Sequence, residues 1–349
     1  MTQSTVGEPG TGSPQPPAEE RASLLGRASG SPLLRLIARR ILVAIPLLLA
    51  VSVLVFVLME LMPGDPARNQ AGMDATDEEV ESVRRRLGLD RPWYERYFGW
   101  LFGALTGNLG TSSVSGRAVS TLLAERLPVT IEIVALAFVV SLAVALPVAI
   151  VAARRPGGWF DRAVMVGAMT LLAVPNYVMA LLLVLLFSVT LRMLPSIGFV
   201  AFDVDPIRNI QSVIMPVLAL AIPLGCFYAR FLRGDLVEQI KSADYIDTAR
   251  AKGAGPWRVL WNHAFRNSSF GLLTIVGLNV GALVGGTVII EQIFVMPGLG
   301  LMMLEGVGSR DIAVVQICVF IFAAVAIFAN LAVDVMYAVL DPRIRYGSR

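Results

Sequence analysis

Six apolar stretches, each about as long as a bilayer is thick, constrain what this chain can fold into. A hydrocarbon core of about 30 Å is crossed by roughly 20 residues of α-helix, and predominantly apolar runs of this length indicate helices. Only 16% of the residues are charged, below the roughly 25% of a soluble protein. The stretches cover 41–62, 129–153, 163–191, 213–232, 271–293 and 312–340. We predict an all-α integral membrane protein with six transmembrane helices.

Among the five stretches that follow the first, three contain proline, at Pro147, Pro175, Pro216 and Pro223. In a membrane helix, neighbouring helices can satisfy the carbonyl groups that a proline leaves free. We therefore expect each of these stretches to continue through its prolines as one span.

The first stretch could instead be the core of a cleaved signal peptide. Such a core is shorter and ends at a small-residue cleavage site, whereas this one ends in Met-Pro-Gly-Asp-Pro at 62–66. We predict a retained first transmembrane helix at 35–62. Residues 1–34, which are rich in Pro, Gly, Ser and Thr, are expected to form a disordered cytoplasmic tail.

The basic residues predict the orientation, because cytoplasmic loops carry an excess of Arg and Lys. The outer loops expected at 192–211 and 294–311 hold three arginines in total, and the eight arginines of the first outer loop are offset by nine carboxylates. The segments at 154–162 and 230–266 together hold ten basic residues and five acidic ones. Both termini are therefore expected in the cytoplasm, the second as a tail at 341–349.

Residues 63–127 are too polar to cross a membrane and are expected to form an extracytoplasmic helical loop. Thr76 or Asp77 can cap a short helix that ends at Gly88. A second helix is predicted from about Pro92. The residues expected on one face of it are Trp93, Tyr97, Trp100 and Leu101.

The polar segment between the fourth and fifth stretches predicts two short helices joined at a glycine corner. Ser242 or Asp244 can cap the first helix, and Gly253 suits the left-handed position that ends it. Pro256 fits the first turn of the second helix. The residues with the spacing of one apolar face in that helix are Trp257, Leu260, Trp261, Ala264 and Phe265. This surface needs something to pack against, either a protein partner or, alternatively, lipid headgroups.

This segment resembles the cytoplasmic EAA coupling loop of ATP-binding-cassette (ABC) importer permeases. The matching residues are Tyr-Ile-Asp-Thr-Ala-Arg-Ala-Lys-Gly at 245–253 and His-Ala-Phe-Arg-Asn at 263–267. From about residue 35 onward, the chain is similar to the first permease of the dipeptide/oligopeptide/nickel family. Asn108 stands where that family often has Asp, and Phe265 where it often has Leu. The supporting motifs lie at 62–66, 87–90, 107–112, 127–132, 291–300, 330–334 and 341–345.

The resemblance implies a MetI-like type I permease in the bacterial cytoplasmic membrane, with a five-helix core at 128–340 and a coupling loop at 235–267. Such a subunit forms half of a pathway for di- or oligopeptides and couples ATP hydrolysis elsewhere to alternating access. The implied partners are a second homologous permease, two ATP-binding subunits or domains, and an extracytoplasmic substrate-binding protein. Nickel and glutathione are alternative substrates. The implied coupling residues are Tyr245, Ala249, Arg250, Ala251, Lys252, Gly253, His263, Arg266 and Asn267.

The chain is not expected to hydrolyse ATP itself. A phosphate-binding loop needs Gly-Lys followed by Ser or Thr, and neither Lys241 nor Lys252 follows a glycine. ATP and Mg are expected on the partner subunits. With one histidine, His263, and two dispersed cysteines, Cys226 and Cys318, no metal or other cofactor is expected on this chain. Nucleic-acid binding is disfavoured, because the basic residues are few and mixed with acidic ones.

Six polar residues lie in or at the edges of the apolar stretches, and intramembrane ionisable groups suggest function by default. They are Glu132, Asn176, Asn279, Glu291, Asn330 and Asp334. They are pathway candidates, although we favour structural roles. Glu132 and Glu291 are expected to reach the interface, and Asp334 to pair with Arg343 or another basic group. The small residues expected to form a close helix-packing surface are Gly277, Gly281, Gly285 and Gly286.

Two other classes of protein are possible alternatives. A secondary transporter driven by an ion gradient needs inverted repeats, broken helices and a series of buried ionisable residues, and no internal repeat is evident in this sequence. A membrane-anchored assembly factor would not need so many spans.

Overall fold

The computed structural model describes residues 32–72, 74–242 and 244–340, with side chains described for all of these except 32–36, 69, 244, 247, 249, 250 and 337–340. The predicted tails at 1–34 and 341–349 lie outside this part of the chain, apart from the last three residues of the first. The described residues are predominantly helical, and their one β-type contact is an isolated bridge between Thr111 and Ala118.

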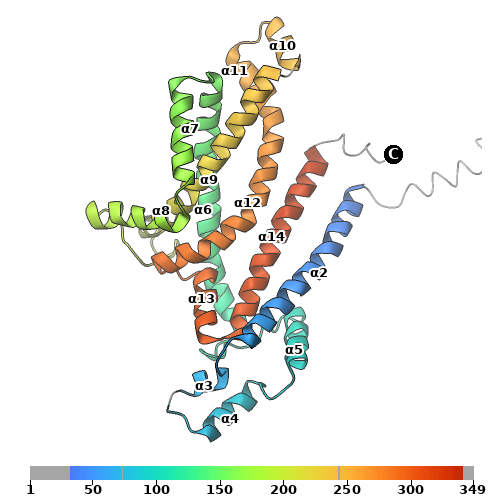
Figure 1. The fold of residues 1–349 in the computed structure, drawn as a ribbon, viewed down its shortest axis with the longest axis vertical. Coiled ribbons are helices and arrows are strands. Elements are labelled where there is room, and N and C mark those ends of the chain that lie inside the picture. The colour runs from blue at the N-terminus through green and yellow to red at the C-terminus, as the bar shows by residue number, and fades with distance from the viewer. Residues whose placement is uncertain (1–31, 73, 243, 341–349) are drawn as a thin grey trace, which may run out of the picture.

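Among the described residues, five continuous helical runs are long and apolar enough to cross a membrane. They are α2 (Pro32–Leu61), α6 (Val119–Arg154), α9 (Pro206–Ser242), the run Pro256–Phe294 that ends in α12 (Phe265–Phe294), and α14 (Ile312–Leu340). Figure 1 shows α9 at the centre, where it packs against α6 and α12, while α2 lies at the edge beside α14. These spans confirm the predicted all-α membrane class.

The prediction of one straight span at 163–191 is wrong. These residues form α7 (Trp159–Leu172), α8 (Asn176–Leu183) and a π-helical turn, η2 (Val184–Thr190), with a bend of 100° between α7 and α8. Pro175 immediately precedes α8 and has an extended ψ of 148°. Its ring disfavours helix at the preceding residue, so the helix ends there. Figure 1 shows α8 projecting sideways from the bundle, and the count of six spans holds only if this bent pair is one span.

A short apolar helix, α13 (Leu299–Ser309), occupies most of the predicted outer loop at 294–311. Its 11 residues are too few to cross a membrane. Val295, with φ of 51°, ends α12 in a left-handed conformation and turns the chain toward α13. The helix lies between the ends of α12 and α14 and contacts both (Figure 1).

Three short helices form the elaboration between α2 and α6: α3 (Pro66–Ala71), α4 (Asp77–Arg86) and α5 (Trp93–Leu105). The predicted cap of α4 is confirmed, since Thr76 and Glu79 form a reciprocal capping box. The hydrogen bonds from Thr76 hold the pKa of Glu79 below its usual value. Gly88, with φ of 67°, follows the end of this helix as expected.

Helix α5 lies alongside the last turns of α2. Its Tyr97 is buried, is hydrogen-bonded to Ser52 of α2 at 2.8 Å, and packs edge-on against Phe56. Trp93, the first residue of α5, is exposed. The contact with Ser52 sets α5 beside the membrane-spanning part of α2.

Two of the four predicted packing glycines join α12 to α14. A Cβ at Gly277 would overlap the Val333 side chain, and one at Gly281 would lie 2.9 Å from Cβ of Ala326. The absence of a side chain therefore lets the two backbones approach closely. The other two glycines, Gly285 and Gly286, do not meet α14 within 4 Å.

Candidate functional site

The first candidate site is the turn between α9 and α12, residues 242–267, which we call the α9–α12 turn. Helix α9 continues to Ser242, ten residues past its predicted end, and α10 (Asp244–Ala251) is the first predicted short helix. The second is not a separate helix. It is formed by α11 (Pro256–Arg258) and a π-helical stretch, η3 (Val259–Ala264), which continue directly into α12.

The π-helical stretch alters the predicted apolar face. A π-helix has more residues per turn than an α-helix, so residues at α-helical spacing no longer share one side. Leu260 and Ala264 are only 3% and 0% exposed, whereas Trp257 and Trp261 expose 44% and 50% of their surfaces. The predicted face is therefore wrong for both tryptophans.

The buried half of the turn fastens it to the transmembrane helices. Ile246 of α10 is fully buried in one apolar cluster with Leu232 and Leu236 of α9 and with Leu260 and Ala264. Each such side chain contributes about 1.5–3 kcal/mol when fully buried. A force on α10 is therefore transmitted to α9 and α12.

The other half of the turn faces away from the transmembrane helices and is exposed. Tyr245 donates a hydrogen bond to Oε1 of Gln239 at 2.7 Å, and the Arg154 guanidinium lies 4.9 Å from the ring centre of Trp257. The side chains of Ala249 and Arg250 lie outside the described residues. Of the other predicted coupling residues, His263 is half-buried, and the exposed ones are Tyr245, Ala251, Lys252, Gly253, Arg266 and Asn267.

Gly253 has the predicted left-handed backbone, with φ of 83°. A Cβ added there would meet nothing within 4 Å. The need for glycine at this corner is therefore set by the backbone conformation and not by crowding within the chain.

A buried ion pair braces α7 against α9 at the same end of the bundle (Figure 1). Arg233 donates from Nε to Oδ1 of Asp161 at 2.7 Å and from Nη2 to Oδ2 at 2.5 Å. The backbone N–H of Gly157 also donates to Oδ2, at 2.7 Å. This pair was not predicted from the sequence, where its signal is an Asp just before one predicted span and an Arg just after the next.

Arg233→Met is expected to destabilise the protein by about 3 kcal/mol, because it leaves the Asp161 carboxylate buried without its cation. The matched control is Arg68→Met, which removes the pair with Asp77, outside the spans, that is 55% and 95% exposed. Exposed pairs contribute about 0–1 kcal/mol. Thermal unfolding of the purified protein in detergent measures both, and equal losses for the two variants would contradict the assignment.

The second candidate site is Glu291, at the opposite end of the bundle from α10. It is fully buried, so the expectation that it reaches the interface is wrong. Thr130 donates to Oε1 of Glu291 at 2.7 Å, and the N–H of Leu301 donates to Oε2 at 2.9 Å. Thr130 in turn accepts from the N–H of Leu299 at 2.8 Å. The two side chains thus satisfy free N–H groups in the first turn of α13.

Two glycines make room for this carboxylate. A Cβ at Gly298 would collide with the Glu291 carboxyl group, and one at Gly300 would lie 2.6 Å from Cα of Val288 and 2.9 Å from Oε2 of Glu291. The predicted motif at 291–300 is therefore a structural unit in which the glutamate and the glycines hold α13 in place.

The other polar candidates are dispersed. Asp334 accepts from Nε of Arg40 at 2.8 Å, which confirms pairing with a basic group, while Arg343 lies outside the described residues. Asn279 donates to the carbonyl of Ile275 at 2.7 Å within its own helix. Glu132 is half-buried, and Asn176 and Asn330 are exposed. Among the described residues, no hydrogen bond or ion pair joins any two of the six.

Most of the chain is similar in sequence to known transport proteins. Residues 145–346 match the family described as binding-protein-dependent transport system inner membrane component, and residues 33–134 match the N-terminal component of such systems. A putative peptide transport system permease protein of Brucella abortus is 42% identical over 311 residues, 89% of this chain and 99% of that protein.

Two further relatives cover similar lengths. A probable peptide ABC transporter permease protein of Sinorhizobium fredii is 34% identical over 89% of this chain and 99% of its own length. The glutathione transport system permease protein GsiC of Escherichia coli K12 is 36% identical over 90% of this chain and its full length. The similarity therefore extends over both candidate sites.

Proposed function

The chain belongs to the family of binding-protein-dependent transport system inner membrane components, and on that premise we propose that it forms half of the translocation pathway of an ATP-driven peptide importer. Membership makes it a multi-pass permease subunit of the inner membrane and not an enzyme. The proposal concerns what it transports, what it binds and which residues couple it to ATP.

The α9–α12 turn is the observation that carries this proposal. One half of it is buried and packs against two spans. The other half is exposed and includes Tyr245, Gly253 and Trp261. Such an arrangement suits a lever, because a partner bound to the exposed half moves the helices fixed to the buried half. We assign that partner as one of two ATP-binding subunits, which hold ATP and Mg. The coupling residues are those predicted from the sequence.

The same assignment sets the orientation, with α10 in the cytoplasm and α4, α5 and α13 on the outer side. The basic residues near the α10 end include Arg154, Arg230 and Arg233, in agreement with the excess of positive charge on cytoplasmic segments. A second homologous permease completes the pathway. An extracytoplasmic binding protein delivers the substrate to the outer side.

Short peptides are the proposed substrates, because the Brucella and Sinorhizobium relatives are named as peptide permeases. Glutathione, itself a tripeptide, is the second candidate, on the basis of the E. coli relative. The bend between α7 and α8 is a broken helix of the kind expected in a secondary transporter. Family membership favours the ATP-driven mechanism over that alternative.

Uptake into proteoliposomes tests the proposed function. The chain is reconstituted with its second permease, ATP-binding subunits and binding protein, and labelled peptides of two to five residues and glutathione are supplied outside. We expect uptake that requires ATP-binding subunits and is unchanged by an uncoupler. Uptake by this chain alone that collapses with the proton gradient would instead establish a secondary transporter.

A further inference from the structure

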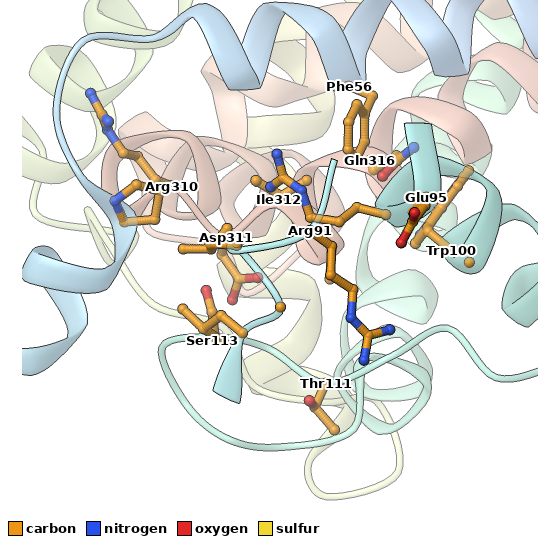
Figure 2. Close-up of a pocket in the computed structure, with 17 residues that line it drawn as sticks. Phe56, Arg91, Glu95, Trp100, Thr111, Ser113, Arg310, Asp311, Ile312 and Gln316 are labelled. Carbon is orange, nitrogen blue, oxygen red and sulfur yellow. The ribbon is translucent and has the colours of Figure 1, made fainter. Parts of the chain in front are cut away.

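A cavity of about 340 Å³ lies at the end of the bundle opposite α10. It is bounded by the segment between α4 and α5, by α5 itself, and by the start of α14, and Figure 2 shows the residues around it. Its volume is within the roughly 300–1,000 Å³ of small-molecule sites. Two sequence motifs that the coupling mechanism does not use, at 87–90 and 107–112, contribute to its wall.

The wall of this cavity holds buried polar atoms that lack partners. Gln316 is 1% exposed, and neither its Nε2 nor its Oε1 has a hydrogen-bond partner among the described residues. The same is true of Nε1 of Trp100 and Nε of Arg96. An unpaired buried polar atom is costly, and here three donor groups and one acceptor adjoin a single cavity.

Charges of both signs line the same cavity. Arg91 and Glu95 are exposed, and among the described residues neither side chain forms an ion pair with another group. Figure 2 labels Phe56, Glu95, Trp100 and Gln316 among the residues that line the cavity. Arg96, by contrast, is already paired with Glu60 at 2.5 Å.

We propose that this cavity binds a short peptide. Its carboxylate would be bound by Arg91, its amino group by Glu95, and its amide group by Gln316 and the Trp100 N–H. This is a substrate-recognition site on the permease itself, separate from the α9–α12 turn. It rests on the proposed function only in that peptides are delivered to this side of the protein.

The mixture of groups favours a peptide over a simple anion. A phosphate or a lipid phosphate would satisfy the donors, but it would be repelled by Glu95, and a lipid phosphodiester would leave Oε1 of Gln316 unpaired. A peptide offers acceptors, an amide donor and a cation in one small molecule. The apolar side chains of Phe56 and Leu89 in the same wall suit its side chains.

Binding is tested on the full chain in lipid nanodiscs without ATP or other subunits, by saturation-transfer NMR with glycyl-leucine as the probe. We expect saturable binding with Kd in the roughly 0.1–1 mM range, because few polar contacts hold a small ligand. Gln316→Leu removes both unpaired atoms at similar volume and should weaken binding at least about tenfold. Trp100→Phe, which retains an aromatic ring but removes the indole N–H, should weaken it several-fold.

The control variant is Gln211→Leu, since Gln211 is an exposed glutamine of α9 outside the cavity, and it should bind as the wild type does. Glycyl-leucinamide, which lacks the carboxylate, should bind more weakly, and inorganic phosphate should not compete. Three results would each overturn the proposal: no saturable binding to the wild type, equal binding to the wild type and to Gln316→Leu, or effective competition by phosphate. Because the measurement needs no transport, it is independent of the importer test.

Discussion

Gly253→Asp is expected to reduce ATP-dependent uptake by roughly tenfold or more while leaving the protein in the membrane. A left-handed backbone costs a residue with a side chain about 1–2 kcal/mol, and Gly253 has φ of 83°. To relieve this strain, α10 would shift relative to the apolar cluster in which Ile246 is buried. Open space surrounds the position, so the aspartate side chain would not clash with the rest of the fold. We therefore expect the substitution to reduce the coupling of ATP hydrolysis to uptake and not the folding of the protein.

The measurement is peptide uptake and peptide-stimulated ATP hydrolysis by the reconstituted importer, with membrane level checked by immunoblot. Gly255→Asp is the matched control, because Gly255 is two residues away, has open space around it and has an ordinary φ of −67°. It adds the same charge to the same surface and should retain most activity. If Gly253→Asp also keeps normal uptake at a normal membrane level, the docking role of this corner is wrong.

Glu291→Ala is expected to destabilise the protein by roughly 2–4 kcal/mol, because it leaves the Leu301 N–H and the Thr130 hydroxyl without their acceptor at about 1–3 kcal/mol each. Glu291→Gln retains one acceptor oxygen and should cost about half as much. The expected local effect is fraying of the first turn of α13, since Glu291 and Thr130 hold its free N–H groups.

Thermal unfolding in detergent measures the loss, and hydrogen exchange of the α13 amides measures the fraying. Glu132→Ala is the control, because Glu132 is a half-buried glutamate of the neighbouring α6 and has no described hydrogen bond. It should change stability by less than about 1 kcal/mol. Unchanged exchange in α13 upon Glu291→Ala would show that this carboxylate does not hold the helix.

Local sequence signals predicted those parts of the fold that local chemistry determines. The apolar runs located the spans, the Thr76–Glu79 pair capped α4, and Gly253 ended α10. In each case the interacting groups lie within a few residues of one another. The resemblance of 245–267 to a coupling loop also rested on contiguous residues.

Proline shows where local signals stop being sufficient. Pro147, Pro216 and Pro223 lie inside continuous helices, whereas the helix ends before Pro175 and the chain bends by 100°. All four occur in apolar runs, so the residue type does not distinguish them. Burial does not distinguish them either, since Pro147 inside α6 and Pro175 at the bend are both exposed.

The candidate sites also depend on contacts between residues that lie far apart in the sequence. The pairing of Glu291 with Thr130 spans 161 positions, and that of Asp161 with Arg233 spans 72. Only the folded chain brings such residues together. The π-helical stretch before α12 is a further case, because it displaced two tryptophans from a face that α-helical spacing had predicted.

The position of α2 has a consequence for how the protein is made. Its partner among the spans within the chain is α14, which it contacts along its length and to which Arg40 is paired through Asp334. During synthesis from the N-terminus, α14 is the last span to emerge. Helix α2 therefore lies in the lipid without that neighbour until translation is nearly complete. Its sequence suits this, since it is the most apolar of the five spans. A chain truncated before residue 312 is therefore expected to lack the α14 contacts of this first helix.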